Sequence, residues 1–129
     1  MMATKPISRR WAVLALTVTL VMPTSLLAGG LAEKAKAELQ AYGAHAGYIT
    51  ATINPCGGKE TEVIFYTGQV KKMLGAVGGD DADFGIVQKA MAKGQAAAKP
   101  TGLDCTDEGG IRLASKLIQL RDAVRDAGK

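Results

Sequence analysis

The residues best suited to chemistry in this 129-residue chain are its two cysteines, Cys56 and Cys105. Two thiols permit a single intramolecular pairing, and a disulfide is their usual form in an exported protein. They lack the C-x-x-C spacing of a redox-active pair. Closing the 49-position loop from 56 to 105 would stabilise the fold by about 4 kcal/mol, because it restricts the unfolded chain. We therefore predict a structural disulfide.

The only histidine, His45, lies one helical turn after Tyr42. Histidine can ligate a metal or haem and titrates near neutral pH. No second strong ligand stands at a recognisable metal-site spacing, and no C-x-x-C-H motif is present. A b-type haem would pair His45 with Met73 or Met91, two methionines at positions typical of core packing. His45 and Tyr42 are thus weak ligand candidates, and we predict neither a metal nor a cofactor.

The remaining polar residues form no recognisable catalytic constellation. No serine stands in a G-x-S-x-G setting, and two bridged cysteines leave no free thiol. Acidic residues gather at 80–83 and 104–108, but without the EF-hand spacing. Both clusters fall where helices are expected to begin, so helix capping explains them. We expect a protein that is not an enzyme.

The first 28 residues have the three-part layout of a secretory signal peptide. A basic segment ending at Arg10 precedes the apolar run 11–21, and small residues follow near Ala28. We expect cleavage after Ala28, with cleavage after Ala32 as the alternative. The product would be one periplasmic or secreted domain, residues 29–129. An uncleaved anchor is disfavoured, because the stretch from 11 to 28 is short for a membrane span and contains Pro23.

The net charge of +4 belongs largely to this leader. Of sixteen basic side chains, three lie in residues 1–28, where no acidic residue occurs, so thirteen face twelve acidic ones in the body. A body this balanced gains little free energy from displacing counterions from DNA or RNA. We therefore expect no nucleic-acid partner, and no membrane association once the leader is removed.

Four stretches of the exported part place apolar residues three and four positions apart, the spacing of one helical face. In the second stretch, Ile64 and Leu74 widen the apolar stripe. Breaks rich in proline and glycine separate the stretches. The pattern predicts four helices, over about 31–53, 59–76, 81–99 and 107–127.

The simplest fold for four such helices is all-α, a small up-down-up-down four-helix bundle. The second and fourth helices then begin at the same end, so Cys56 and Cys105, which directly precede them, come together. Within the first helix, Gly43 and Gly47 each cost about 1 kcal/mol relative to alanine, so this helix could kink or end early.

An α+β fold with a short hairpin is the alternative. Residues 48–53 and 62–67 are rich in β-branched and aromatic side chains, which favour strands. The two segments could pair across the loop between them.

The expected function is binding. A secretory leader and a small helical body without a catalytic motif favour a chaperone-, inhibitor- or accessory-like protein with a protein or peptide partner. The alternative is a small-ligand or haem-binding bundle that uses His45 and a methionine.

Overall fold

The structure, a computed structural model, describes residues 30–129, so the predicted signal peptide over 1–28 lies outside the described residues. The described part is all-helical, which confirms the predicted fold class. Its elements are α2 (Ala32–Ile53), α3 (Glu60–Ala76), α4 (Asp81–Ala97), the short 3-10 helix η2 (Gly102–Cys105) and α5 (Asp107–Ala127). The alternative hairpin is wrong, because residues 48–53 and 62–67 lie within α2 and α3. No helix of the described part is both long and apolar enough to cross a membrane.

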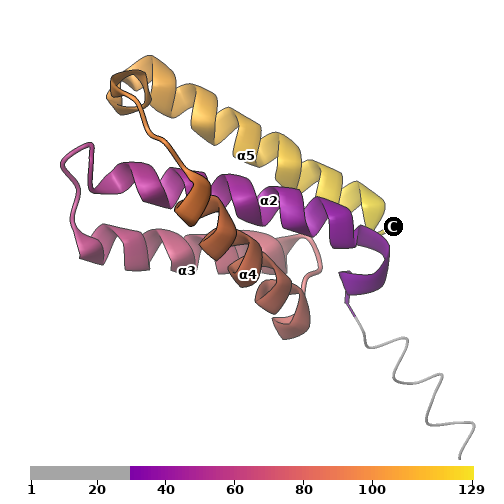
Figure 1. The fold of residues 1–129 in the computed structure, drawn as a ribbon. Helices are drawn as coiled ribbons and strands as arrows, with labels where there is room; N and C mark the ends of the chain where they lie inside the picture. The colour runs from indigo at the N-terminus through magenta and orange to yellow at the C-terminus, as the bar shows by residue number, and fades with distance from the viewer. Residues whose placement is uncertain (1–29) are drawn as a thin grey trace, which may run out of the picture.

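Helix α2 is the central element of the bundle (Figure 1). Consecutive helices run in opposite directions, with α3 and α5 on two sides of α2 and α4 crossing it. The core follows the predicted stripe of α2 and receives side chains from all three neighbours. Its fully or almost fully buried members include Leu39, Tyr42 and Ala46 of α2, Val70 and Leu74 of α3, Val87 of α4, and Leu117 and Val124 of α5.

Glycines bring α2 and α4 into backbone contact. A Cβ at Gly47 would fall on the carbonyl oxygen of Met91, and a Cβ at Gly94 on that of Ala44. The kink or early end considered at the glycines of α2 does not occur: the helix continues through them, because the close approach offsets their low helix propensity. The departure from helical backbone angles occurs earlier, at Ala35 (φ −111°, ψ 16°).

Side chains cap the later helices at the predicted acidic clusters. The carboxylate of Asp80 accepts a 2.9 Å hydrogen bond from the backbone N–H of Asp83 at the start of α4. At α5, the Thr106 hydroxyl accepts a 3.0 Å hydrogen bond from the N–H of Gly109. Capping thus accounts for the position of Asp80, as predicted.

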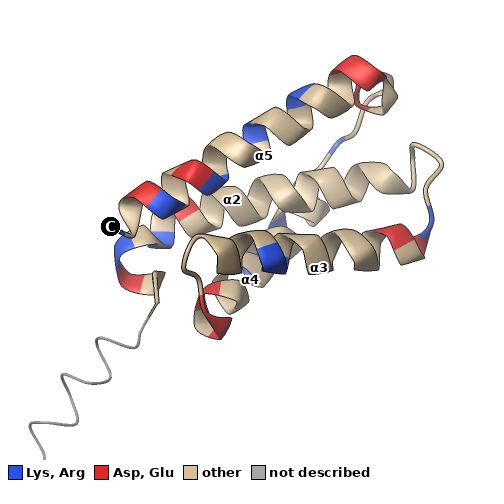
Figure 2. Ribbon diagram, turned by 180° about the vertical axis from the view of Figure 1, so that it is seen from behind, with Lys and Arg blue, Asp and Glu red and all other residues tan. Residues whose placement is uncertain are grey.

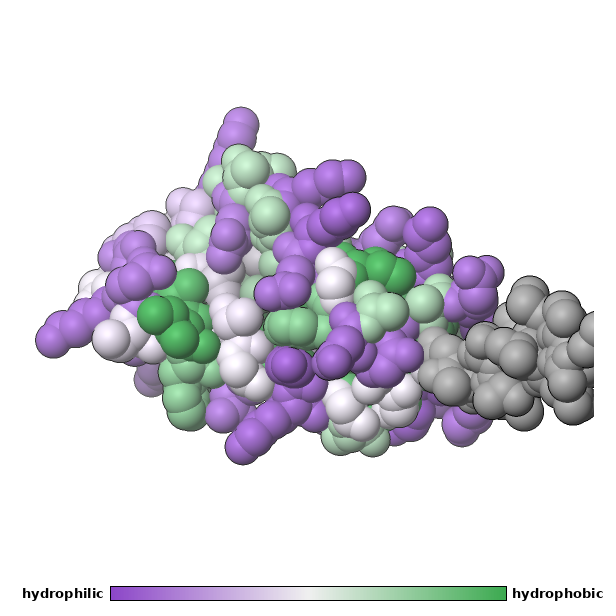
Figure 3. Space-filling model, turned by 90° about the horizontal axis from the view of Figure 1, so that it is seen from below, coloured by the Kyte–Doolittle hydropathy of each residue, from purple (hydrophilic) through white to green (hydrophobic). Residues whose placement is uncertain are grey.

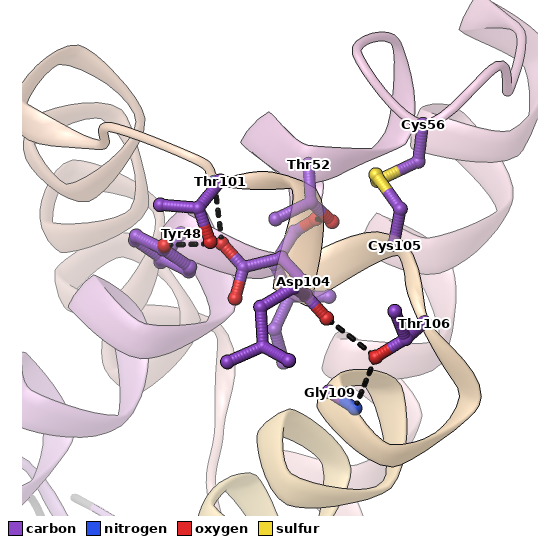
Figure 4. Close-up of a disulfide and its surroundings, with 10 residues drawn as sticks. Tyr48, Thr52, Cys56, Thr101, Asp104, Cys105, Thr106 and Gly109 are labelled. Carbon is purple, nitrogen blue, oxygen red and sulfur yellow. Dashed lines mark hydrogen bonds between the residues drawn. A yellow bond between two sulfur atoms is a disulfide. The ribbon is translucent and has the colours of Figure 1, made fainter.

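The predicted disulfide is confirmed. Cys56, in the connection between α2 and α3, is bonded to Cys105 at the end of η2, with their Cα atoms 5.2 Å apart (Figure 4). The bond lies at the end of the bundle where α3 and α5 begin, as the topology requires.

Candidate functional site: an apolar groove between α3 and α5

The two helices that follow the cysteines leave a groove between them. Helices α3 and α5 flank α2 with little direct contact between each other (Figure 2). The resulting cavity of about 310 Å³, called here the α3/α5 groove, is lined mainly by apolar side chains. Its lining comprises Ile49 and Thr52 of α2, Tyr66 and Met73 of α3, Asp104 of η2, and Gly110, Leu113, Ala114, Leu117 and Ile118 of α5.

The apolar character of the groove follows from the charge pattern of its walls. Helix α2 carries no lysine, arginine, aspartate or glutamate from Leu39 to Ile53, and Figure 2 shows this uncharged part of α2 between α3 and α5. On α5, the predicted stripe is wider than the bundle covers. Leu117 is 4% exposed and packs in the core, whereas its neighbour Ile118 lines the groove and is 45% exposed.

A hydrogen-bonded carboxylate stands at the disulfide end of the groove (Figure 4). One oxygen of Asp104 accepts a 2.6 Å hydrogen bond from the Tyr48 hydroxyl and a 2.9 Å bond from the backbone N–H of Thr101. These bonds, that of Tyr48 foremost, hold the pKa of Asp104 below its usual value. Asp104 is therefore a fixed negative charge at neutral pH.

Two tyrosine hydroxyls in the described part are buried without a hydrogen-bond partner. They belong to Tyr42 on α2 and Tyr66 on α3. Burial raises the pKa of Tyr42 to about 12, although the charge of Arg121 opposes the shift. Burial, together with the nearby Tyr42, also raises the pKa of Tyr66. Both phenols therefore stay protonated and carry an unused hydrogen-bond donor, and Tyr66 is part of the groove lining.

The predicted ligand candidate His45 joins α2 to α5. Its Nε2 donates a 2.9 Å hydrogen bond to the carbonyl oxygen of Leu113. Burial lowers the pKa of His45, more than the Leu113 bond raises it, and the charge of Lys116 lowers it further. The imidazole is therefore neutral at pH 7, and ligation through Nε2 would require it to break this bond. Tyr42, the second candidate, is fully buried in the core.

The described residues contain no group of three or more histidine, cysteine or acidic side chains placed to hold a metal ion. The acidic residues that gather in the sequence at 80–83 and 104–108 are used instead at helix and turn starts.

A second hollow lies between α2 and α4. It has a volume of about 550 Å³, and Lys36, Lys89 and Lys93 contribute to its lining. Although it is larger than the α3/α5 groove, its lysines are exposed to solvent and no buried polar group points to a ligand. We therefore regard it as a solvated basic surface and the α3/α5 groove as the better candidate site.

The sequence did not predict the groove, although it contains one signal of it. The apolar stripe on α5 includes Ile118 and is wider than the strip of α5 that packs against α2. An exposed apolar side chain beside a cavity is typical of a surface that receives a partner. Ile64, expected to widen the stripe of α3, is 66% exposed and its neighbour Phe65 is 68% exposed, but neither lines the groove.

Comparison of the chain with known protein families, with curated proteins and with solved structures finds no match.

Proposed function

We propose that this is a small exported, non-enzymatic helical protein that binds a protein or peptide partner in the α3/α5 groove. The observation that carries the proposal is the groove itself, an apolar cavity between two helices that flank α2 with little contact between each other. An amphipathic helix or extended peptide that places apolar side chains between α3 and α5 would complete the bundle.

The size of the groove supports a peptide anchor over a large cofactor. The volume of about 310 Å³ is at the lower end of the roughly 300–1,000 Å³ that is typical of ligand pockets. That space suits one or two aliphatic side chains. The haem alternative gains no support from the groove lining, which includes Met73 but not His45.

Further apolar side chains near the groove extend the surface available to a partner. On α5, Ile111 stands seven residues before Ile118, on the same helical face, and is 68% exposed. Leu103 in η2, beside the disulfide end, is 50% exposed. Figure 3 shows the opposite side of the molecule, below α3 in the view of Figure 1 and away from α5, where hydrophobic patches also lie among hydrophilic side chains.

Export is part of the proposal and rests on two observations. The described chain contains a disulfide, which is compatible with an oxidising compartment. Residues 1–28 have the layout of a secretory signal peptide. The periplasm of a bacterium satisfies both requirements.

The experiment is capture of partners from periplasmic extract with two matched variants. Ile118→Lys puts a charge into the groove, whereas Ile64→Lys puts the same charge on an exposed isoleucine of α3 outside the lining. We expect the protein and Ile64→Lys to retain the same partner, and Ile118→Lys to lose at least tenfold in affinity. Equal capture by both variants would contradict the groove as the site. A chromophore in protein from the native host that His45→Ala removes would instead favour the ligand-binding alternative.

A further inference from the structure

A buried carboxylate holds the first residue before α2. Asp83, in the first turn of α4, is fully buried. Its Oδ2 accepts hydrogen bonds from the backbone nitrogens of Leu31, at 2.8 Å, and Asp80, at 2.9 Å. Its Oδ1 is buried without any partner. Within residues 30–129, no lysine, arginine or histidine forms an ion pair with Asp83. One oxygen of its carboxylate therefore has no hydrogen-bond partner, and the carboxylate has no counter-ion within these residues.

Two carboxylates converge on the peptide link between Gly30 and Leu31. A Cβ at Gly30 would lie 2.6 Å from Oδ2 of Asp80 and 2.6 Å from Oδ2 of Asp83. The Leu31 side chain is 7% exposed and lies against Gly78 and Gly128, so this residue is fixed in the core. The nitrogen of Leu31 is therefore held against acidic oxygens by the packing of its own side chain.

A free α-amino group at Leu31 would satisfy this site better than a peptide N–H. A peptide nitrogen offers one hydrogen and no charge, whereas an ammonium offers three hydrogens and a positive charge. Paired with a buried carboxylate, such a charge removes both the orphan oxygen and the unpaired ion. The preceding residues fit a cut at this bond, because Ala28 and Gly30 supply small residues at the third and first positions before it.

We propose that signal peptidase cleaves between Gly30 and Leu31, and that the new α-ammonium of Leu31 pairs with Asp83. The inference rests on the export proposed above. One water is consumed: the C–N bond breaks, Gly30 takes oxygen and leaves as a carboxylate on the leader, and the Leu31 nitrogen takes the two protons to become an ammonium. The cut precedes folding, during export, and Leu31 then enters the core with its charge on Asp83.

The two cleavage sites expected from the sequence suit the structure less well. A cut after Ala32 would remove the buried Leu31 side chain and its hydrogen bond to Asp83. A cut after Ala28 would keep Leu31 but leave it in a peptide link, so that Oδ1 of Asp83 would stay without a partner.

The first test is N-terminal sequencing and intact mass of the mature protein from its native host. We expect a single amino terminus at Leu31. A terminus at Gly29 or Glu33 overturns this inference and leaves export standing. A chain that retains its leader and stays in the cytoplasm overturns export and this inference together.

The second test measures the rate at which an amine reagent labels the α-amino group at neutral pH. The pair with Asp83 favours the protonated, unreactive amine, and each unit of raised pKa slows labelling about tenfold. We expect Asp83→Asn to speed labelling at least tenfold. Asp81→Asn, the matched control, removes a carboxylate whose side chain is 99% exposed and should leave the rate unchanged. Equal rates in all three proteins would overturn the ion pair, and the N-terminal sequence decides the cut even if Asp83→Asn does not fold.

Discussion

The hydroxyl of Tyr48 on α2 donates a 2.6 Å hydrogen bond to the carboxylate of Asp104, one residue before the disulfide-bonded Cys105. This bond connects the middle helix of the bundle to η2, which carries the disulfide and the end of the α3/α5 groove. It also lowers the pKa of Asp104, so the contact links stability to pH.

Acid should weaken this connection. Because the pKa of Asp104 is lower in the folded chain than its unfolded value of about 3.9, the stabilisation is present above that value and is lost as pH falls through the folded-state pKa. We expect Tyr48→Phe to lower the unfolding midpoint at pH 7 and to flatten the loss of stability below about pH 4. Urea titrations of both proteins across the acid range measure this. An unchanged acid slope in Tyr48→Phe would show that the bond does not hold the pKa.

Removal of the Tyr42 hydroxyl should have the opposite effect on stability at neutral pH. This hydroxyl is buried without a partner, so Tyr42→Phe relieves a desolvation cost and should stabilise the protein by about 1 kcal/mol. Urea unfolding at pH 7 checks the sign, with the destabilising Tyr48→Phe as its contrast. A loss of stability on Tyr42→Phe would reveal a hydrogen bond to the hydroxyl.

Alkaline titration provides a separate check on Tyr42. Its pKa of about 12 exceeds the usual value of 10. Between pH 10 and pH 12 the unfolded chain loses the tyrosine proton while the folded chain keeps it, so the free energy of unfolding is unaffected below pH 10 and falls as pH rises towards 12. The pKa values of Tyr48 and Tyr66, the other tyrosines, are raised as well. Phenolate absorbance should therefore show no tyrosine titrating at its usual pH while the protein is folded, and Tyr42→Phe should remove a step near pH 12.

The backbone contact between α2 and α4 predicts opposite effects for two glycine substitutions. In Gly47→Ala the new Cβ meets the carbonyl of Met91, so we expect a loss of about 1–3 kcal/mol in the free energy of unfolding. In Gly68→Ala, in the middle of α3, nothing lies within 4 Å of the new Cβ, so higher helix propensity should add about 1 kcal/mol. Denaturant unfolding of both variants tests this. Equal effects at the two positions would contradict the close crossing.

Loss of the disulfide should remove a large part of the stability. Cys56→Ser should destabilise the protein by up to about 4 kcal/mol, and Cys105→Ser by the same amount, because each frees the loop between them. At about 4–8 °C per kcal/mol for a domain of this size, the thermal midpoint should fall by tens of degrees at most. The double variant should be no worse than either single variant. Two reactive thiols in the non-reduced protein would contradict the bond.

Helix positions and the disulfide could be predicted because they depend on local pattern and on order along the chain. Apolar spacing predicted α5 over 107–127, its observed extent, and proline and glycine signals placed the ends of the others within two residues. The up-down order then required Cys56 and Cys105 to meet.

The groove could not be predicted, because it depends on how far apart two helices stand. Gly47 lets α2 approach the backbone of Met91, which is 44 positions away in the sequence. Helix propensity describes only the local cost of the glycine and not this contact. The close contact of α4 with α2 depends on how the helices pack in three dimensions. The separation of α3 from α5, which leaves Ile118 exposed, depends on the same packing. Asp83 is a second example. Its role in capping α4 follows from neighbouring residues and could be predicted, whereas its hydrogen bond to Leu31, 52 positions away, could not.

The Cys56–Cys105 bond also turns the middle of the chain into a covalent ring. Helices α3 and α4 lie wholly within that ring, and α2 and α5 leave it as two tails. A protease that nicks the ring anywhere between the two cysteines, for example at the turn around Gly78, leaves a molecule whose pieces stay joined until the bond is reduced. A nick in either tail gives a fragment that separates on denaturation without any reductant. Gel mobility with and without reductant therefore reports which half of the bundle opens first.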